Sequence, residues 1–203
     1  MAATKKGVWD LQEARDKQLQ SEWNYSATDP GSYLTWGNNN KGQLGQNSTQ
    51  DISSPVQVPG SWNSVFASGS GEGTSGGVKT DGTMWTWGFN GQGQGGRNDR
   101  VHRSSPVQIG TSTNWATGVL RTGNYWTMAL KTDNTLWTWG RNGEGQLGQN
   151  DLTLRSSPTQ IGTDTDWNYA QDKYDQDSKT GMVIKTNGTL WGWGTQDVGA
   201  LGL

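Results

Sequence analysis

Residues 136–148 read Leu-Trp-Thr-Trp-Gly-Arg-Asn-Gly-Glu-Gly-Gln-Leu-Gly, and copies of this stretch recur along the 203-residue chain. The Trp-Thr-Trp-Gly core of this stretch is matched at Leu34-Thr-Trp-Gly37, Trp85-Thr-Trp-Gly88 and Trp191-Gly-Trp-Gly194. The second tryptophan therefore stands at positions 36, 87, 139 and 193, with spacings of 51, 52 and 54 residues. A nearly constant period in this range is typical of solenoids and propellers, in which each repeat is one supersecondary unit.

Four further markers follow the core in a constant order. They are a glycine-rich turn, a Ser-Ser-Pro segment, a third tryptophan and a Lys-Thr-Asp/Asn-Gly/Asn-Thr segment. The prolines lie at 55, 106 and 158, the third tryptophans at 62, 115 and 167, and the Lys-Thr segments at 79–83, 131–135 and 185–189. Because several markers recur together in one order, chance does not explain the pattern.

Each marker indicates β structure. In the core, strict alternation places both tryptophans on one face of a strand and the intervening residues on the other. Asp-Gly and Asn-Gly are strong hairpin signals, so each Lys-Thr segment is expected to join two strands. The expected pairs are 77–79 with 84–87, 128–130 with 136–139, and 182–184 with 190–193. Proline lacks a backbone donor, so the prolines mark the start or the edge of short outer strands at 56–58, 107–109 and 159–161. A further strand is expected near 115–117.

About four strands in roughly 50 residues predict an all-β fold made of propeller-type blades. Residues 30–203 would form this domain, with two strands, two complete four-stranded units and a final three strands. At four strands per blade this is about three and a quarter blades. Such an arc leaves strand edges unpaired, so we expect it to be open or completed by another chain, in a homo- or hetero-oligomer.

The composition agrees with an aromatic core. Leu, Ile, Val and Phe make up only about 14% of the chain, but there are 13 tryptophans and 31 glycines. Ten of the tryptophans recur in register and are expected to form the structural core of the repeat: Trp36, Trp62, Trp85, Trp87, Trp115, Trp137, Trp139, Trp167, Trp191 and Trp193. Burying ten indoles would remove on the order of 2,000 Å² from water.

The Leu-Trp-x-Trp-Gly string followed by the glycine-rich turn and Ser-Ser-Pro resembles the repeats of the regulator of chromosome condensation family. It is carried by residues 34–58, 84–109 and 136–161, with a fragment at 190–202. The resemblance implies a propeller, of seven blades in that family. One departure is the family's Ala-Gly-x-x-His before the hairpin, because the matching stretches near 67, 117 and 170 contain no histidine. The nucleotide-exchange activity of the family's namesake is not expected, since the chain has too few blades and is acidic.

Residues 1–29 differ from the repeats and are expected to form a partly helical docking arm. The segment 8–24 contains charged helix formers without Gly or Pro, which favours a helix over about 9–22. The apolar residues expected to dock the arm are Val8, Trp9, Leu11, Leu19 and Trp23. The alternative is a helix that caps the open edge of the propeller. Residues 7–19 also resemble the N-termini of tail and other virion proteins of marine bacteriophages.

Several kinds of chemistry are excluded or disfavoured. The chain has no cysteine, a net charge of −2 and no apolar run long enough for a membrane span, and no basic stripe for nucleic acid. The Gly-x-Gly-x-x-Gly pattern at 91–96 and 143–148 is followed by Ser-Ser-Pro and a strand instead of a helix, so it indicates turns and no cofactor is expected. His102, the only histidine, is expected to be solvated. Asp164, Asp166, Asp172, Asp175 and Asp177 carry suitable oxygens for Ca²⁺ but lack the EF-hand register, so no metal is expected.

We therefore expect a non-enzymatic structural or adhesive component of a bacteriophage particle, located on its tail or capsid surface. The arm would bind other virion proteins, and the blades would contact proteins or a host surface. The alternative is a bacterial propeller module, extracellular or on the cell surface, that binds carbohydrate. Tyr125 and Trp126 lie outside the repeated tryptophan series, so they are the candidate surface platform for stacking on a sugar.

Overall fold

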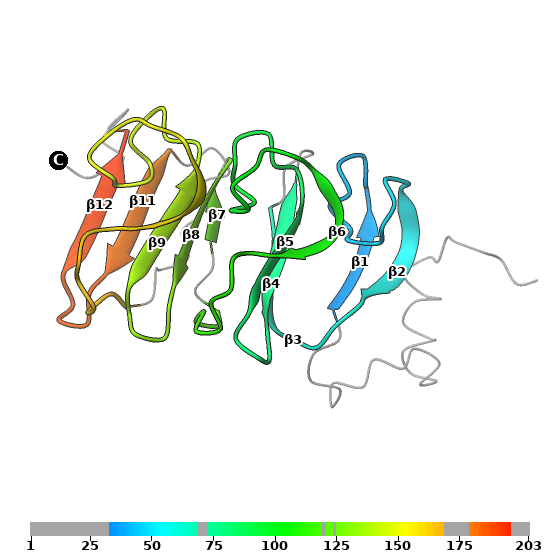
Figure 1. Ribbon diagram of the computed structural model, residues 1–203, viewed down its shortest axis with the longest axis horizontal. Helices are drawn as coiled ribbons and strands as arrows, with labels where there is room; N and C mark the ends of the chain where they lie inside the picture. Colours follow the sequence, from blue (N-terminus) through cyan, green and yellow to red (C-terminus); the bar gives the residue numbers. More distant parts are fainter. Residues whose placement is uncertain (1–32, 69–72, 119–120, 124, 169–178, 196–203) are drawn as a thin grey trace, which may run out of the picture.

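The computed structural model describes residues 33–68, 73–118, 121–123, 125–168 and 179–195, and the regular structure in them is β-strand. Four antiparallel sheets follow one another across the molecule in chain order, from β1 and β2 at one end to β11 and β12 at the other (Figure 1). The expectation of an all-β fold is confirmed. The arm, residues 1–29, lies outside the described residues, so its expected helix and docking side chains remain predictions.

The two middle sheets are complete four-stranded blades. One contains β3 (Trp62–Ala67), β4 (Thr74–Lys79), β5 (Met84–Gly88) and β6 (Arg103–Gln108). The next contains β7 (Arg121–Gly123), β8 (Trp126–Leu130), β9 (Leu136–Gly140) and β10 (Arg155–Gln160). In each sheet the strands lie in sequence order, which is the up-and-down arrangement of a propeller blade.

In the part of the chain that the structure describes, the two end sheets have two strands each. β1 (Tyr33–Gly37) pairs with β2 (Ile52–Val58), and β11 (Thr180–Ile184) pairs with β12 (Leu190–Gly194). The strand expected at 115–117 is reduced to one bridge, between Trp115 and Lys131, and the inner strand β7 begins only at Arg121. Gly118 intervenes with a φ of 73°, which ends the extended backbone. In the last sheet, the described residues likewise show one bridge, between Trp167 and Lys185.

The Ser-Ser-Pro segments form edge strands. Each proline is the fourth residue of its strand, Pro55 in β2, Pro106 in β6 and Pro158 in β10. β6 and β10 lie at the ends of their sheets, where a residue without a donor is tolerated. The edge placement is thus confirmed, but the strands begin before the proline and not after it.

The Lys-Thr segments form the expected hairpins, which lie at the lower ends of the sheets in Figure 1. In the first, the Gly82 N–H donates to the Lys79 carbonyl and the Lys79 N–H donates to the Thr83 carbonyl, both at 2.9 Å. This is a three-residue turn with a bulge, in which Gly82 has a φ of 77°. Asn134 takes the corresponding position in the next hairpin, with a φ of 60°.

The core is divided into three clusters, and each cluster packs one sheet against the next. The buried members are Val58, Trp62 and Trp87 in the first; Val78, Met84, Ile109, Trp115, Ala129 and Trp139 in the second; and Trp126, Met128, Leu130, Leu136, Leu147, Trp167 and Val183 in the third. Stability therefore comes largely from the joints between blades, as in repeat proteins in general.

Most of the ten repeat tryptophans lie in these joints. Trp62, Trp87, Trp115, Trp139 and Trp167 are buried, and Trp85, Trp137 and Trp193 pack against the clusters while half-buried. The core assignment was wrong for Trp36 and Trp191, which are 57% and 49% exposed. Both lie on end sheets, where no further described sheet covers them.

Candidate functional site

The joint between consecutive blades is built by one repeated contact. The second tryptophan of a blade donates its indole N–H to a backbone carbonyl in the glycine-rich turn of the preceding blade. The pairs are Trp87 with Gln43 at 2.9 Å, Trp139 with Gln94 at 2.8 Å and Trp193 with Gln146 at 2.8 Å. A glycine in the same turn allows this approach, since a Cβ on Gly96 would lie 2.7 Å from the Trp139 indole nitrogen. Glycine at this position is thus required by the next blade.

A buried asparagine fixes the shape of each turn, and sequence reasoning missed this residue. The Asn142 side-chain oxygen accepts from the Leu147 N–H at 2.9 Å, and its amide donates to the Asp151 and Thr153 carbonyls. Asn39 and Asn90 make corresponding contacts. The signal was an Asn two residues after each Trp-Gly pair, at 39, 90 and 142.

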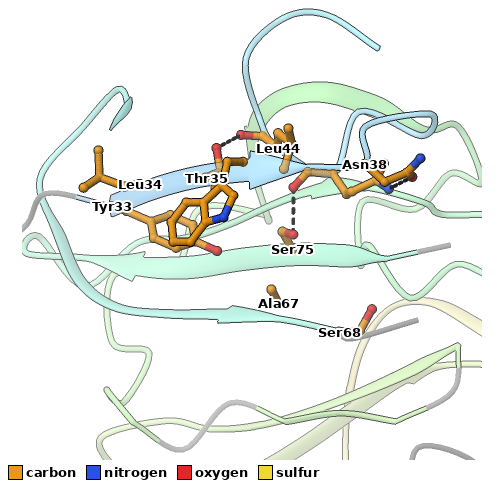
Figure 2. A pocket seen from close by; sticks show the side chains of 10 residues that line it. Tyr33, Leu34, Thr35, Asn38, Leu44, Ala67, Ser68 and Ser75 are labelled. Atoms are coloured by element: carbon orange, nitrogen blue, oxygen red, sulfur yellow. Dashed lines mark hydrogen bonds between the residues drawn. The ribbon is translucent and has the colours of Figure 1, made fainter. Parts of the chain in front are cut away.

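Trp36 occupies the same repeat position as Trp87 and Trp139, but on the first blade. Trp87 and Trp139 are 0% exposed because a preceding turn covers them. Trp36 lines a pocket of about 430 Å³. Figure 2 shows this pocket between Thr35 of β1 and Ala67 and Ser75 of the β3–β4 pair. β1 pairs with β2 on one side, and no described strand pairs with its other edge.

The walls of this pocket are held by internal hydrogen bonds. The Thr35 hydroxyl donates to the Leu44 carbonyl at 2.7 Å, and the Ser75 hydroxyl donates to the Gln43 carbonyl at 2.8 Å (Figure 2). Burial raises the pKa of the Tyr33 phenol at the other end of β1. The walls of the pocket are therefore preformed, and its lining includes the exposed Trp36 indole and no charged residue.

A second repeated arrangement lies at the hairpins. The lysine that opens each Lys-Thr turn places its ammonium over two indoles of its own repeat. The distances to the ring centroids are 5.4 and 3.6 Å for Lys79 over Trp62 and Trp85, 5.0 and 4.3 Å for Lys131 over Trp115 and Trp137, and 4.8 and 5.0 Å for Lys185 over Trp167 and Trp191. These are cation–π contacts.

Two of these lysines line pockets between the outer strands of adjacent blades. Lys79 and Trp85 line one of about 310 Å³, together with Pro106 of their own blade and with Gly45 and Pro59 of the preceding sheet. Lys131 and Trp137 line another of about 460 Å³, bounded by Pro158. The pockets are thus repeat-related hollows on successive blades.

The third lysine, Lys185, forms ion pairs with two aspartates of the preceding loop. The Lys185 ammonium lies 2.6 Å from an Asp164 oxygen and 3.0 Å from an Asp166 oxygen, and these partners raise its pKa. Both aspartates belong to the acidic cluster, whose other members, at 172, 175 and 177, lie outside the described residues. Within the described part, no group of three or more potential ligands that could hold a metal is found.

The remaining candidates have local roles. His102 is exposed and its Nδ1 accepts from the Asn90 N–H at 3.0 Å. The surface platform was a wrong prediction for Trp126, which is only 3% exposed. Trp126 begins β8, a central strand paired on both sides, so it faces the core cluster. Tyr125 is half-buried, with its ring centroid 5.4 Å from that of Phe89. No helix in the described residues is long and apolar enough to cross a membrane.

Comparison with known proteins finds the same repeat. The model of the regulator of chromosome condensation (RCC1) repeat matches residues 30–73, 81–130 and 133–168. The ultraviolet-B receptor UVR8 of Arabidopsis thaliana is 27% identical over 181 residues, which cover 88% of this chain and 40% of the receptor.

Two solved structures share the fold. Human WBSCR16 superposes with a TM-score of 0.64 at 21% identity, covering 86% of this chain and 46% of that one. Prp20p of Saccharomyces cerevisiae superposes with a TM-score of 0.55 at 16% identity, covering 96% and 47%. The chain thus spans less than half the length of these relatives.

Proposed function

The chain belongs to the regulator of chromosome condensation (RCC1) repeat family, and we propose that it is a non-enzymatic protein-binding module that docks another protein chain onto the open face of its first blade. The repeated polar residues support the absence of catalysis, because they already serve the fold. Asn39, Asn90 and Asn142 hold turns, and Thr83 and Thr135 hold hairpins.

The observation that carries the proposal is the contrast between Trp36 and its equivalents. Inside the stack, the indole is covered by the turn of a neighbouring blade and its N–H is satisfied by a carbonyl. On the first blade, the same indole is 57% exposed beside an edge of β1 with which no described strand pairs. Exposed apolar surface next to a free β-edge is typical of an interaction site.

A second copy of this chain has the chemistry that fits this face. Within the chain, the turn carbonyls of Gln43, Gln94 and Gln146 each accept the indole N–H of the following blade, so a glycine-rich turn of this kind is the partner that suits Trp36. Protein binding is also described for a relative of the same fold, since Prp20p has binding properties to Gsp1p and histones.

The test is self-association measured by light scattering and sedimentation over a series of protein concentrations. We expect the unmodified chain to associate and Trp36→Ala to remain monomeric at the same concentrations. Leu152→Ala is the control, because Leu152 is similarly exposed, at 67%, but lies outside the first blade. A monomeric unmodified chain, or a Trp36→Ala variant that associates equally well, would contradict the proposal.

The bacteriophage particle is a narrower proposal for the setting, supported by the sequence of residues 7–19. Here the arm binds other virion proteins and the blades face outward on the tail or capsid surface. Co-purification with particles, with and without residues 1–25, tests it. Particle association that survives the deletion would rule out anchoring by the arm.

Carbohydrate binding on a bacterial surface is the alternative function. Trp126 cannot serve as its stacking platform, because this side chain is buried. The remaining support for carbohydrate binding is the pair of exposed indoles, Trp36 and Trp191. A glycan array tests it, with Trp36→Ala and Trp191→Ala as the comparison. Glycan binding that is unchanged by both substitutions would exclude these indoles as its platform.

A further inference from the structure

The three hairpin lysines differ in the groups that contact their ammonium. Lys185 has two carboxylate partners, and it is buried at 9% exposure. Lys131 contacts the Ser112 hydroxyl at 3.2 Å, and Lys79 contacts its two indoles. Among the described residues, no carboxylate lies within 4.0 Å of either ammonium, and both side chains remain half-exposed.

The difference arises in the loop before the third tryptophan. Gly110-Thr-Ser-Thr-Asn-Trp115 aligns with Gly162-Thr-Asp-Thr-Asp-Trp167, so Ser112 and Asn114 stand where Asp164 and Asp166 stand. The first repeat has a shorter loop, Pro59-Gly-Ser-Trp62. The lysine of the third repeat therefore has two carboxylates within 4.0 Å, whereas in the other two repeats no described carboxylate lies that close to the ammonium.

The accessible space lies beside the two lysines that lack carboxylates. The pocket at Lys131 is also lined by Arg97, Arg103 and Asp99, so its charge is positive overall. The pocket at Lys79 has no other charged residue in its lining. Asp81 and Asp133 lie in the same hairpins as these two lysines. One carboxylate oxygen of each aspartate accepts the hydrogen bonds of its hairpin, from Thr83 and Thr135 respectively.

We propose that the pockets at Lys79 and Lys131 bind the carboxylates of an extended acidic segment of a partner protein, one carboxylate on each of two successive blades. The indoles hold each ammonium in place, and the pockets open between the outer strands, where an extended chain can cross from blade to blade. Two linked weak contacts of this kind reinforce each other because the second binds at high effective concentration. The site is separate from the first-blade face and does not depend on the function proposed for it.

Carboxylates are favoured over phosphates because the third repeat supplies carboxylates to the same lysine. Asp164 and Asp166 act there as a built-in occupant of the position. An acidic peptide also agrees with pockets whose walls are partly indole and proline, such as Trp137 and Pro158.

The experiment titrates the full chain with a labelled oligoglutamate peptide, with oligoglutamine as the uncharged comparison. We expect oligoglutamate to bind more tightly, with an affinity that falls as salt is added. Lys79→Met/Lys131→Met should weaken binding by about tenfold, as two exposed ion pairs allow. Lys179→Met is the matched control for the loss of a single charge and should bind like the unmodified chain.

Two further variants separate charge from folding. Lys79→Arg/Lys131→Arg keeps both charges and should retain binding. Ser112→Asp introduces the aspartate of the third repeat next to Lys131 and should weaken binding several-fold while leaving the fold intact. Equal binding of oligoglutamate and oligoglutamine, or full affinity in Lys79→Met/Lys131→Met, would overturn the proposal. So would a single-stranded oligonucleotide that binds as tightly through the same lysines.

Discussion

Gly95 and Arg97 replace a leucine and a glutamine that the other two complete turns share. Leu44 and Leu147 are buried at the first position. Gln149, at the second, donates to the Thr138 hydroxyl at 3.1 Å, whereas Arg97 donates to the equivalent Thr86 hydroxyl at 2.7 Å. Burial lowers the pKa of the Arg97 guanidinium to about 10, and its side chain is 4% exposed.

The two replacements depend on each other. A Cβ on Gly95 would lie 2.7 Å from the Arg97 Nη1, so the missing leucine provides the space that the guanidinium fills. One of its nitrogens, Nε, is buried without a hydrogen-bond partner in the described structure. Arg97 is thus accommodated at a cost that the leucine–glutamine pair avoids.

We predict strong coupling between these positions. Gly95→Leu alone should destabilise the protein by about 1–3 kcal/mol through overpacking. Adding Arg97→Gln should recover that loss, with a coupling energy of at least about 1 kcal/mol. A double-mutant cycle from urea unfolding measures it. Additive effects of the two substitutions would show that they do not share the space.

At the scale of a single hairpin, a carboxylate holds the turn through hydrogen bonds that depend on pH. Asp81 accepts from the Thr83 hydroxyl at 2.6 Å and from its N–H at 2.9 Å, and Asp133 does the same with Thr135. These hydrogen bonds lower the pKa of both carboxyls. In the third hairpin, Asn187 makes the same contacts with a side chain that does not titrate.

Because the pKa of these carboxyls is lower in the folded than in the unfolded protein, they stabilise the fold at any pH above their unfolded pKa. This stabilisation is lost as the pH falls through their folded pKa. Asp81→Asn/Asp133→Asn should therefore preserve the hairpins and reduce the loss of stability below about pH 4. Urea unfolding at neutral and acidic pH tests this. Asn187→Asp is the reciprocal variant, which should add acid sensitivity, and identical pH profiles for all variants would refute the assignment.

The blade joint gives a graded prediction for its tryptophans. Trp139→Phe removes a buried N–H contact to the Gln94 carbonyl and should cost about 1–2 kcal/mol. Trp193→Phe removes the same contact from a half-buried joint and should cost less. Trp36→Phe should leave the stability of the isolated chain within about 0.5 kcal/mol, since Trp36 is exposed.

Chemical denaturation of the three variants at low protein concentration measures this order. Each variant keeps an aromatic ring, so the comparison isolates the indole N–H and part of the buried area. A cost for Trp36→Phe equal to that of Trp139→Phe would mean that the first blade is covered within the chain.

At the scale of the whole molecule, the described ends of the stack differ from its centre. The two middle blades have four strands and a joint on each side, while the end sheets have two strands and one described joint. In repeat proteins, stability is approximately a sum of local terms and nearest-neighbour terms. The ends of this stack should therefore open more readily than its centre.

Hydrogen exchange measured by mass spectrometry tests the gradient. We expect the slowest exchange in β4, β5, β8 and β9 and faster exchange in β1–β2 and β11–β12. Two-stranded sheets are marginal on their own, which is the physical reason. Uniform protection from β1 to β12 would show that the chain unfolds as one unit without weaker ends.

The sequence alone determined the repeat, the all-β fold, the hairpins and the family, because each depends on local signals. Glycines where φ is positive, Asp-Gly turns and alternating tryptophans act within a few residues, and the period repeats them. The position of the prolines on edge strands follows from the same local chemistry.

Only the tertiary structure decided which repeated residues are equivalent in their surroundings. Trp36 and Trp139 share the local sequence Thr-Trp-Gly, but one is exposed and the other buried, because burial depends on whether the turn of another blade covers the indole. Trp126 stands outside the repeated series and is buried because its strand is central. Lys131 and Lys185 share one motif, and a loop on the other side of the indole decides which receives carboxylates. Neighbours that are distant in sequence determine exposure and charge pairing, so the surfaces available for binding emerge only from the folded stack.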